Sequence, residues 1–314
     1  MSKYEPKPAA QTVIRPAARN VEFKEQPMRP PQEAESLLIR LTQGCTHNKC
    51  NFCYISRGHS FAVASPEQVE AELLEQKQFY PANTKVYFLG SNPFALSAAR
   101  LEVYISLLRR HFPEFAELSM HARITDIARK SAAELEELRA AGITHLYIGT
   151  ENGNDEALRL MNKGSTADEA VEQLLRLDEA GIGYVTFYVL GFGGRGQGRA
   201  CGADTAEMFN RIKPRRITTT GLTVFPGTPL AEMTRSGKFA EASEKEKLEE
   251  LLVFFERLET ETVFDSVHYL NPLNLRFDTR RNKDLVMGGI KDFLAAHSEE
   301  EIEKMVGRES MLSL

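Results

Sequence analysis

Three of the four cysteines in the chain lie close together in the sequence, at Cys45, Cys50 and Cys53. They follow an apolar run, SLLIRLT, that is typical of a strand, so we expect them on one loop at its end. A loop with this C-x4-C-x2-C spacing brings three thiolates to one point, where they bind a soft metal or an iron–sulfur cluster. The fourth cysteine, Cys201, is interpreted as a buried or loop thiol, with a catalytic role on the substrate side as the less favoured alternative.

The spacing alone leaves two kinds of site open. A structural zinc site needs four ligands, and His47 or His59 is near enough in the sequence to supply the fourth. Alternatively, three cysteines hold three irons of a 4Fe–4S cube and leave the fourth iron free to bind a small chelating molecule. Phe52 and Tyr54, on either side of the last cysteine, suit packing against a flat ring, and they suit ordinary loop packing equally well.

The bulk composition is that of a globular protein without a strong charge. The chain has 314 residues, 42% of them hydrophobic and 26% charged, with a formal net charge of −5. This balance gives no electrostatic footprint for nucleic acid or for an anionic membrane. The N-terminus, MSKYEPKPAAQ, is unlike a signal peptide, and no apolar run approaches the ~18 residues of a membrane span. We therefore expect a cytoplasmic protein.

Short apolar runs alternate with amphipathic helical stretches from Ser36 onward. Strands are expected within or near 36–42, 85–89, 117–120, 145–149, 184–190 and 217–225. Helices are expected to begin after Ser65 and to span 97–111, 131–142, 166–180, 203–212 and 248–258. Strands that alternate with helices indicate a parallel sheet with right-handed crossovers. Because no linker separates the units, the pattern predicts an α/β fold, a partial (β/α)6 TIM-like barrel, with its chemistry at the carboxyl ends of the strands.

Two segments depart from this repeat. Residues 1–35 carry many prolines and predict an extended lead-in, whereas residues 261–314 contain two further helical stretches, the last beginning after Ser298. We therefore predict an N-terminal extension (1–35), a barrel (36–260) and a C-terminal extension that packs on the barrel (261–314). Both extensions are expected to cover the open side, because a partial barrel leaves its interior exposed.

The cysteine loop resembles that of the radical S-adenosylmethionine (SAM) superfamily, whose usual signature is C-x3-C-x2-C with an aromatic residue before the last cysteine. Phe52 matches that aromatic residue, but one extra residue separates Cys45 from Cys50, so the loop must bulge. The resemblance extends over roughly 36–258, through FLGSNP, ITHLYIGTENGND, MNKGST, AGIGYVTFYVLGFGG and LTVFPGTPL. The last three segments resemble the coproporphyrinogen dehydrogenase-like and methylthiotransferase-like branches.

This resemblance implies an enzyme in which Cys45, Cys50 and Cys53 hold a single 4Fe–4S cluster and the open iron is chelated by SAM. Reductive cleavage of SAM would give methionine and a 5′-deoxyadenosyl radical, which abstracts hydrogen from an unknown small-molecule or peptide substrate. An electron donor such as flavodoxin or ferredoxin is implied as a partner. The alternatives are a zinc-stabilised barrel without redox chemistry and an RNA-modifying radical SAM enzyme, the latter disfavoured by the acidic charge.

The resemblance also implies which residues contact SAM. The turn Gly90-Ser91-Asn92 would hold the methionyl ammonium, and Arg123 would pair with the methionyl carboxylate. Glu151 would accept hydrogen bonds from the ribose hydroxyls or the ammonium. Gly191 begins a stretch that matches G-x-G-x-x-G but lies in the fifth unit without a helix directly after it, which favours a flexible loop over SAM and not a dinucleotide site. The expected SAM contacts are Phe52, Tyr54, Gly90, Ser91, Asn92, Arg123, Glu151 and Gly191.

Overall fold

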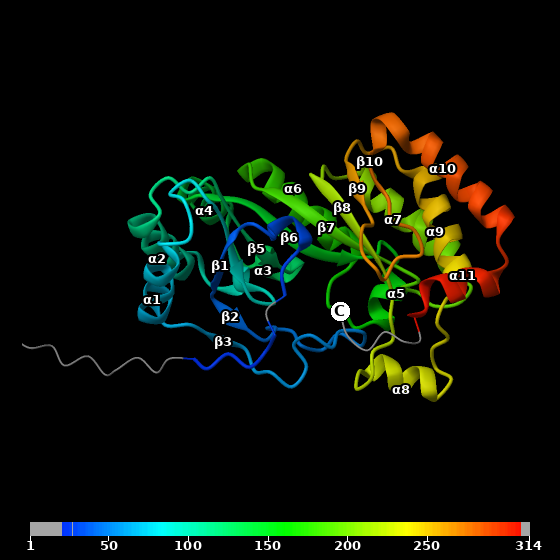
Figure 1. Ribbon diagram of the computed structural model, residues 1–314, viewed down its shortest axis with the longest axis horizontal. Helices are drawn as coiled ribbons and strands as arrows, with labels where there is room; N and C mark the ends of the chain where they lie inside the picture. The colour runs from blue at the N-terminus through cyan, green and yellow to red at the C-terminus, as the bar shows by residue number, and fades with distance from the viewer. Residues whose placement is uncertain (1–20, 27, 309–314) are drawn as a thin grey trace, which may run out of the picture.

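The structure is a computed structural model, and it describes residues 21–26 and 28–308. Eight strands form one curved sheet in the order β1-β4-β5-β6-β7-β8-β9-β10 (Figure 1). In this sheet β1 and the strands from β4 to β9 run parallel, and only β10 is antiparallel to its neighbour. Their bounds are β1 (Leu37–Arg40), β4 (Lys85–Leu89), β5 (Glu117–Ala122), β6 (Ile143–Glu151), β7 (Gly183–Leu190), β8 (Arg216–Gly221), β9 (Val263–Asp265) and β10 (Arg276–Asp278). The predicted α/β partial barrel with a parallel sheet is confirmed.

The helices between these strands begin where the sequence places side-chain caps. Ser65, Ser97, Ser131, Thr166 and Ser243 each accept a hydrogen bond from a backbone N–H in the first turn of the helix that follows. These helices are α1 (Pro66–Gln76), α2 (Ala98–His111), α4 (Ala132–Ala141), α6 (Ala167–Ala180) and α9 (Glu244–Arg257), and α7 (Gly198–Asn210) lies between β7 and β8. In Figure 1, α1 and α2 flank the β1 end of the sheet, and α9 flanks the opposite end.

Several short elements in the loops were not predicted from the sequence. A two-stranded antiparallel ribbon brackets the cysteine loop, because one strand precedes the loop and the other follows it. The remaining short elements follow strands or connect loops. They are β2 (Thr42–Gln43), β3 (Ala62–Val63), η1 (Pro31–Glu33), η2 (Pro93–Ala95), α3 (Ile124–Ala128), α5 (Asp155–Leu160) and α8 (Pro229–Arg235).

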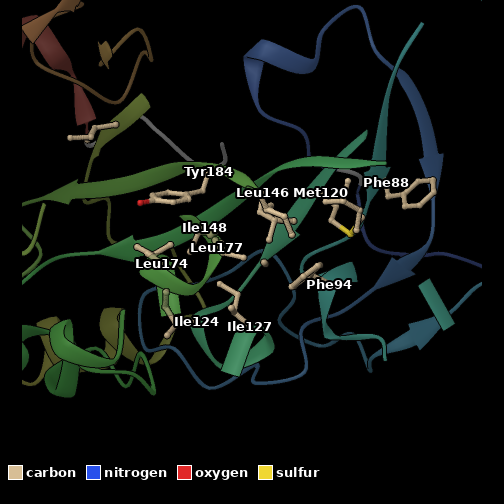
Figure 2. Close-up of a cluster of buried hydrophobic side chains, with 14 of the residues drawn as sticks. Phe88, Phe94, Met120, Ile124, Ile127, Leu146, Ile148, Leu174, Leu177 and Tyr184 are labelled. Carbon is tan, nitrogen blue, oxygen red and sulfur yellow. The ribbon is translucent and has the colours of Figure 1, made fainter. Parts of the chain in front are cut away.

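The main hydrophobic core lies between the outer face of the sheet and the helices. Alternate residues of each strand point outward, so Met120 of β5 and Leu146 and Ile148 of β6 share this layer (Figure 2). Leu174 and Leu177 of α6 pack against them from the helix side. This packing fixes which side chains face inward. A shift of one residue in the pairing register of a strand would move its apolar side chains from the outer face of the sheet to the inner face.

The inner face of the sheet carries the other set of side chains. Tyr87, Tyr147 and Val185 form a small buried cluster there, with Phe187 packed against it. In β6 the inward positions alternate from His145 through Tyr147 and Gly149 to Glu151 at the carboxyl end. The barrel interior is therefore aromatic at its centre and polar at both ends.

The N-terminal segment lies against this inner face. The carboxylate Oε1 of Glu33, in η1, accepts hydrogen bonds from Ser119 Oγ at 2.8 Å and Tyr147 Oη at 2.7 Å. Burial alone would raise the pKa of Glu33, but these bonds, with those from His145 and Ser36, lower it to about 2. The segment is therefore anchored to two strands by an ionised carboxylate. The predicted lead-in up to residue 20, and residue 27, lie outside the described residues.

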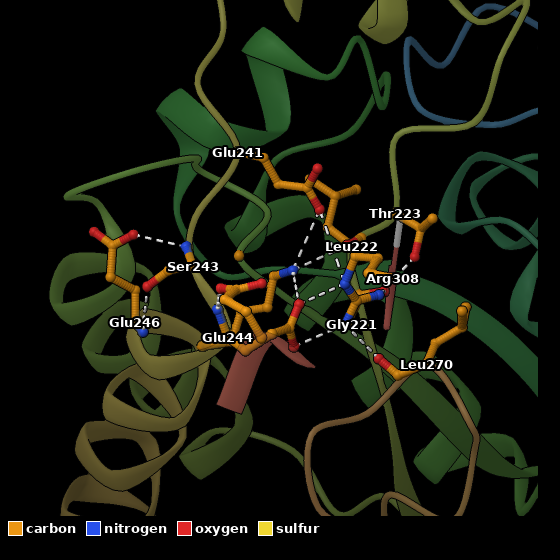
Figure 3. A network of polar contacts seen from close by, with 12 residues as sticks. Gly221, Leu222, Thr223, Glu241, Ser243, Glu244, Glu246, Leu270 and Arg308 are labelled. Atoms are coloured by element: carbon orange, nitrogen blue, oxygen red, sulfur yellow. Dashed lines mark hydrogen bonds and ion pairs between the residues drawn. The ribbon is translucent and has the colours of Figure 1, made fainter. Parts of the chain in front are cut away.

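The C-terminal segment adds β9 and β10 to the sheet, and α10 (Thr279–Ala296) and α11 (Glu299–Val306) follow. Arg308 then forms a two-point ion pair with Glu244 of α9, with nitrogen–oxygen distances of 2.5 and 2.9 Å (Figure 3). The same guanidinium donates to Thr223 Oγ1 at 2.6 Å and to the Leu270 carbonyl at 2.7 Å. Arg308 thus joins the end of the described chain to the loop after β8. The division into three segments at 35 and 260 remains a prediction.

Candidate active site

The three clustered cysteines line one cavity of about 350 Å³ at the carboxyl ends of the strands. Cys45, Cys50 and Cys53 are free thiols and partly exposed. Asn48, between the first two, has a left-handed backbone with φ 47°. The left-handed turn at Asn48 lies within the stretch that separates Cys45 from Cys50.

A turn after α5 supports the cysteine loop from outside. The Asn162 carbonyl is 2.7 Å from His47 Nε2, and Asn51 Nδ2 donates to the Leu160 carbonyl at 2.7 Å. Gly164 in this turn has φ +81°, and a Cβ there would lie 2.8 Å from His47 Cε1. Only glycine therefore permits this close approach. The turn belongs to the MNKGST segment, so that segment positions the cysteines.

Glu151 and Lys163 form a buried ion pair on the cavity wall, with 2.6 Å between Oε1 and Nζ. Glu151 has a left-handed backbone, φ 64°, where β6 ends in a register irregularity. A Cβ on Gly149 would lie 2.3 Å from Glu151 Oε1 and 2.8 Å from Lys163 Nζ. The pair therefore occupies the space that a side chain at residue 149 would need.

The turn after β4 meets the cysteine loop and the N-terminal segment. Gly90 has φ +144°, and a Cβ there would lie 2.0 Å from Thr42 Oγ1. Ser91 Oγ lies 3.1 Å from Glu25 Oε1, which also accepts from Ser56 Oγ at 2.7 Å. Glu25 is buried and lines the cavity. The N-terminal segment therefore contributes a carboxylate to the site.

Asn92 lies behind this turn and does not line the cavity. Its Nδ2 donates to Thr46 Oγ1 at 2.7 Å and to Asp126 Oδ2 at 2.9 Å, and its Oδ1 accepts from the Thr46 amide at 3.2 Å. These bonds use the amide to brace the residue after Cys45. The expected contact of Asn92 with SAM has no support in this placement.

Arg123 and His121, at the end of β5, both line the cavity. Arg123 Nη2 donates to the Lys163 carbonyl at 2.9 Å, and Nη1 donates to Thr125 Oγ1 at 3.0 Å. Burial lowers the pKa of His121 to about 4, so its imidazole is neutral, and Nδ1 lies 2.5 Å from Tyr87 Oη. The cavity wall thus combines a cation with a neutral ring.

The aromatic residues of the loop pack against neighbouring loops. Phe52 meets Phe192 edge to face at 5.0 Å between ring centroids, and Tyr54 lies 4.3 Å from the Phe225 ring. Gly191 lies outside the cavity, and its N–H donates to Glu250 Oε2 at 2.8 Å. Its left-handed φ of 74°, and the 2.8 Å that would separate a Cβ there from Lys247 Cε, give it a structural role beside the site. The expectation that no helix directly follows the glycine stretch is wrong, because α7 begins at Gly198.

The structure brings most of the expected site residues to one cavity. The expected residues that line the cavity are Cys45, Cys50, Phe52, Cys53, Tyr54, Gly90, Ser91, Arg123 and Glu151. The other two expected residues, Asn92 and Gly191, lie outside it. Sequence reasoning missed Glu25, because the proline-bearing segment has no periodicity that predicts where a side chain points. It also missed Lys163, although the MNKGST segment was recognised. Cys201 is buried away from the cavity, and burial raises its pKa to about 12.

Comparison with known proteins identifies the family. A model of the radical SAM superfamily matches residues 39–198, just over half of the chain. The chain belongs to the radical SAM superfamily. Enzymes of this family use a 4Fe–4S cluster and SAM, which confirms the enzyme class and the cofactors that the cysteine loop implied. The zinc-stabilised barrel is therefore not favoured.

Individual relatives of this radical SAM enzyme are distant. A tRNA-2-methylthio-N(6)-dimethylallyladenosine synthase from Alkalilimnicola ehrlichii is 24% identical over 218 residues, which cover 66% of this chain and 47% of the relative. The chain thus spans about half the length of that curated relative. Methylornithine synthase has a similar fold, with a TM-score of 0.51 at 14% identity, and the match covers 86% of this chain and 85% of that one. A radical SAM methyltransferase from Kitasatospora setae gives 0.52 at 18% identity, over 65% and 39%.

Three cysteine thiols on one loop are the donor set that three irons of a 4Fe–4S cluster need. No group of three or more His, Cys, Asp or Glu side chains in residues 21–26 and 28–308 is arranged to hold one metal ion. A cubane needs a wider set, because each cysteine binds a different iron. Neither His47 nor His59 lines the cavity. Burial raises the pKa of Cys50 to about 11.

The described helices are each too short or too polar to cross a membrane.

Proposed function

We propose that this enzyme holds a 4Fe–4S cluster on Cys45, Cys50 and Cys53 and cleaves SAM reductively to attack a small-molecule or peptide substrate in the same cavity. The observation that carries the proposal is that three free thiols of one loop share a cavity with Ser91, Arg123 and Glu151. When bound and reduced by one electron, the cluster and SAM would supply methionine and a 5′-deoxyadenosyl radical, and the radical would take a hydrogen atom from the substrate. The electron comes from an external donor such as flavodoxin or ferredoxin.

The protein side chains orient SAM around the cluster. In this proposal Arg123 pairs with the methionyl carboxylate, which is supported by its position in the cavity lining and by the hydrogen bond from its guanidinium to the Lys163 carbonyl. Glu25 and Glu151 provide carboxylates for the ammonium and the ribose hydroxyls. Lys163 holds the Glu151 carboxylate in one position through the 2.6 Å ion pair. Phe52 and Tyr54 pack the loop against Phe192 and Phe225.

Cysteine substitution tests this proposal directly. The protein is purified without oxygen, reconstituted with iron and sulfide, and compared with Cys45→Ala, Cys50→Ala and Cys53→Ala. Wild type should be brown with about four irons per chain, as a 4Fe–4S cluster requires. After reduction with dithionite it should form 5′-deoxyadenosine from SAM. Each of the three variants should lose the brown colour and this activity.

Cys201→Ala is the matched control. Its thiol is buried, unlike the partly exposed thiols of the loop, and it lies outside the cavity, beside Gly193. This variant should keep iron, colour and 5′-deoxyadenosine formation. A colourless wild-type protein that binds one zinc, or a brown protein that never cleaves SAM, would contradict the proposal.

A further inference from the structure

The cavity has a second polar region, deeper in the barrel than the cysteines. Thr218 and Gln32 line it, the first on β8 and the second on η1 of the N-terminal segment. Thr218 lies three residues before Gly221, where β8 ends. At about 3.3 Å per residue this places it roughly 10 Å below the carboxyl edge of the sheet, where the cysteine loop lies.

The Gln32 amide has one free hydrogen-bonding atom. Its Nε2 is 3.4 Å from Asp265 Oδ2, and this carboxylate fixes which end of the amide is the donor. Its Oε1 is buried and has no hydrogen-bond partner. A buried acceptor without a partner is costly, so Oε1 is suited to a donor supplied by a ligand.

Thr218, which lines the same region, carries a second unpaired oxygen. The residue is 9% exposed, and its Oγ1 is buried without a partner. Thr218 is the register partner of Asp265 on the adjacent strand, so both unpaired oxygens belong to neighbours of one carboxylate. A hydroxyl donates one hydrogen bond and accepts others, which makes Thr218 suited to an acceptor on the ligand.

Asp265, the carboxylate beside these two oxygens, is already paired with two cations. Asp265 Oδ2 lies 2.5 Å from Arg216 Nη1 and 3.0 Å from Arg276 Nη2. A carboxylate or phosphate here would face the acceptor oxygen of Gln32 and would compete with Asp265 for its two cations. An ammonium would satisfy Gln32 but would lie close to two guanidinium groups. A neutral group that both donates and accepts meets neither penalty.

We propose that Gln32 and Thr218 bind a neutral amide or hydroxyl group of the substrate. The N–H or O–H of that group donates to Gln32 Oε1, and Thr218 Oγ1 donates to its oxygen. This inference rests on the proposed function, because it places the substrate in the cavity that holds the cluster and SAM. It limits the substrate to molecules that carry such a group at one end.

Small probe molecules test the inference without knowledge of the substrate. Crystals of the reconstituted protein with SAM are soaked in N-methylacetamide, 2-propanol, acetate or methylammonium at matched concentrations. We expect a neutral probe within hydrogen-bond distance of both Gln32 Oε1 and Thr218 Oγ1. Comparison of the N-methylacetamide and 2-propanol soaks shows whether this position binds an amide group or a hydroxyl group.

Two isosteric substitutions on β8 provide the matched comparison. Thr219 also has a buried Oγ1 without a partner, but it does not line the cavity. Thr218→Val should weaken probe binding about tenfold, as expected for one lost hydrogen bond, and Thr219→Val should leave it unchanged. Both variants should fold at least as well as wild type, because each removes an unpaired buried hydroxyl. Their melting temperatures check this.

Three results would overturn the inference. These are binding of acetate or methylammonium in preference to the neutral probes, absence of both neutral probes from this position, and unchanged probe binding in Thr218→Val. Formation of 5′-deoxyadenosine is measured on the same protein. If SAM is not cleaved, the proposed function fails, whereas SAM cleavage without a probe at Gln32 and Thr218 refutes only the inference.

Discussion

Lys163 Nζ lies 2.6 Å from Glu151 Oε1, and this ion pair is buried beside Cys50 in the cavity wall. The two residues are twelve positions apart, at the end of β6 and in the turn that supports the cysteine loop. The pair therefore links Glu151, the last residue of β6, to the MNKGST segment that positions the cysteines. A substitution that displaces either partner should affect cofactor binding before it affects the fold.

Gly149→Ala tests the importance of this pair. The added Cβ would lie 2.3 Å from Glu151 Oε1, so the carboxylate must move. We expect SAM to bind roughly tenfold more weakly and the protein to lose about 1–3 kcal/mol of unfolding free energy through overpacking. Gly288→Ala in α10, where a Cβ meets open space, is the control. It should gain up to about 1 kcal/mol in stability and bind SAM normally. Normal SAM affinity in Gly149→Ala would show that the pair is not part of the SAM site.

Glu25→Gln tests the carboxylate that the N-terminal segment contributes. Glu25 is buried, and its Oε2 accepts from the Gly44 amide at 2.8 Å, so glutamine can keep much of the packing. Because it removes a negative charge placed for the methionyl ammonium, SAM should bind about tenfold more weakly in equilibrium dialysis. Glu22→Gln, exposed in the same segment, should have no effect. Equal SAM affinities for both variants would remove Glu25 from the site.

The pH dependence of stability tests the anchor of the N-terminal segment. The pKa of Glu33 is about 2 in the folded protein against 4.5 ordinarily, which corresponds to ~3 kcal/mol of stability. A lowered folded-state pKa stabilises the protein above pH 4.5, and the contribution declines as pH falls from about 5 toward 2. Urea unfolding of wild type and Glu33→Gln between pH 7 and pH 4 should therefore show a difference that shrinks toward acid. A difference that is constant with pH would contradict an ionised anchor.

Arg308→Met tests the attachment of the C-terminal segment. Arg308 and Glu244 are both buried. Loss of the Arg308 guanidinium leaves the Glu244 carboxylate paired with Lys247 alone. Breaking a buried pair costs about 3–5 kcal/mol, so the melting temperature should fall clearly. Arg235→Met removes the exposed pair with Glu232 and should change stability by less than about 1 kcal/mol. Equal melting temperatures of the two variants would show that the described C-terminus does not stabilise the barrel.

Much of the barrel is predictable because its signals are local. Ser65, Ser131 and Thr166 mark helix starts through capping, and the alternating apolar runs give the strands of the parallel sheet. The strands β9 and β10 have only three residues each, so neither shows a usable alternation in the sequence. Their position depends on the edge that β8 offers, which is a property of the folded sheet.

The site divides in the same way. The cysteines follow a strand and Glu151 is the last residue of one, so a sequence motif or a strand end locates them. Asn92 also follows a strand, but its side chain turns to Asp126 and Thr46, a choice that depends on tertiary neighbours. Glu25 reaches the cavity from a segment without periodicity, so its role emerges only when the segment is placed against the barrel.

The account depends most on an iron of the cluster that is free to bind SAM. Electron paramagnetic resonance of the reduced, reconstituted protein measures this directly. The account predicts a 4Fe–4S signal whose g-values shift when SAM is added, in wild type and in Cys201→Ala alike. A signal that is unchanged by saturating SAM, or no cluster signal at all, would contradict it.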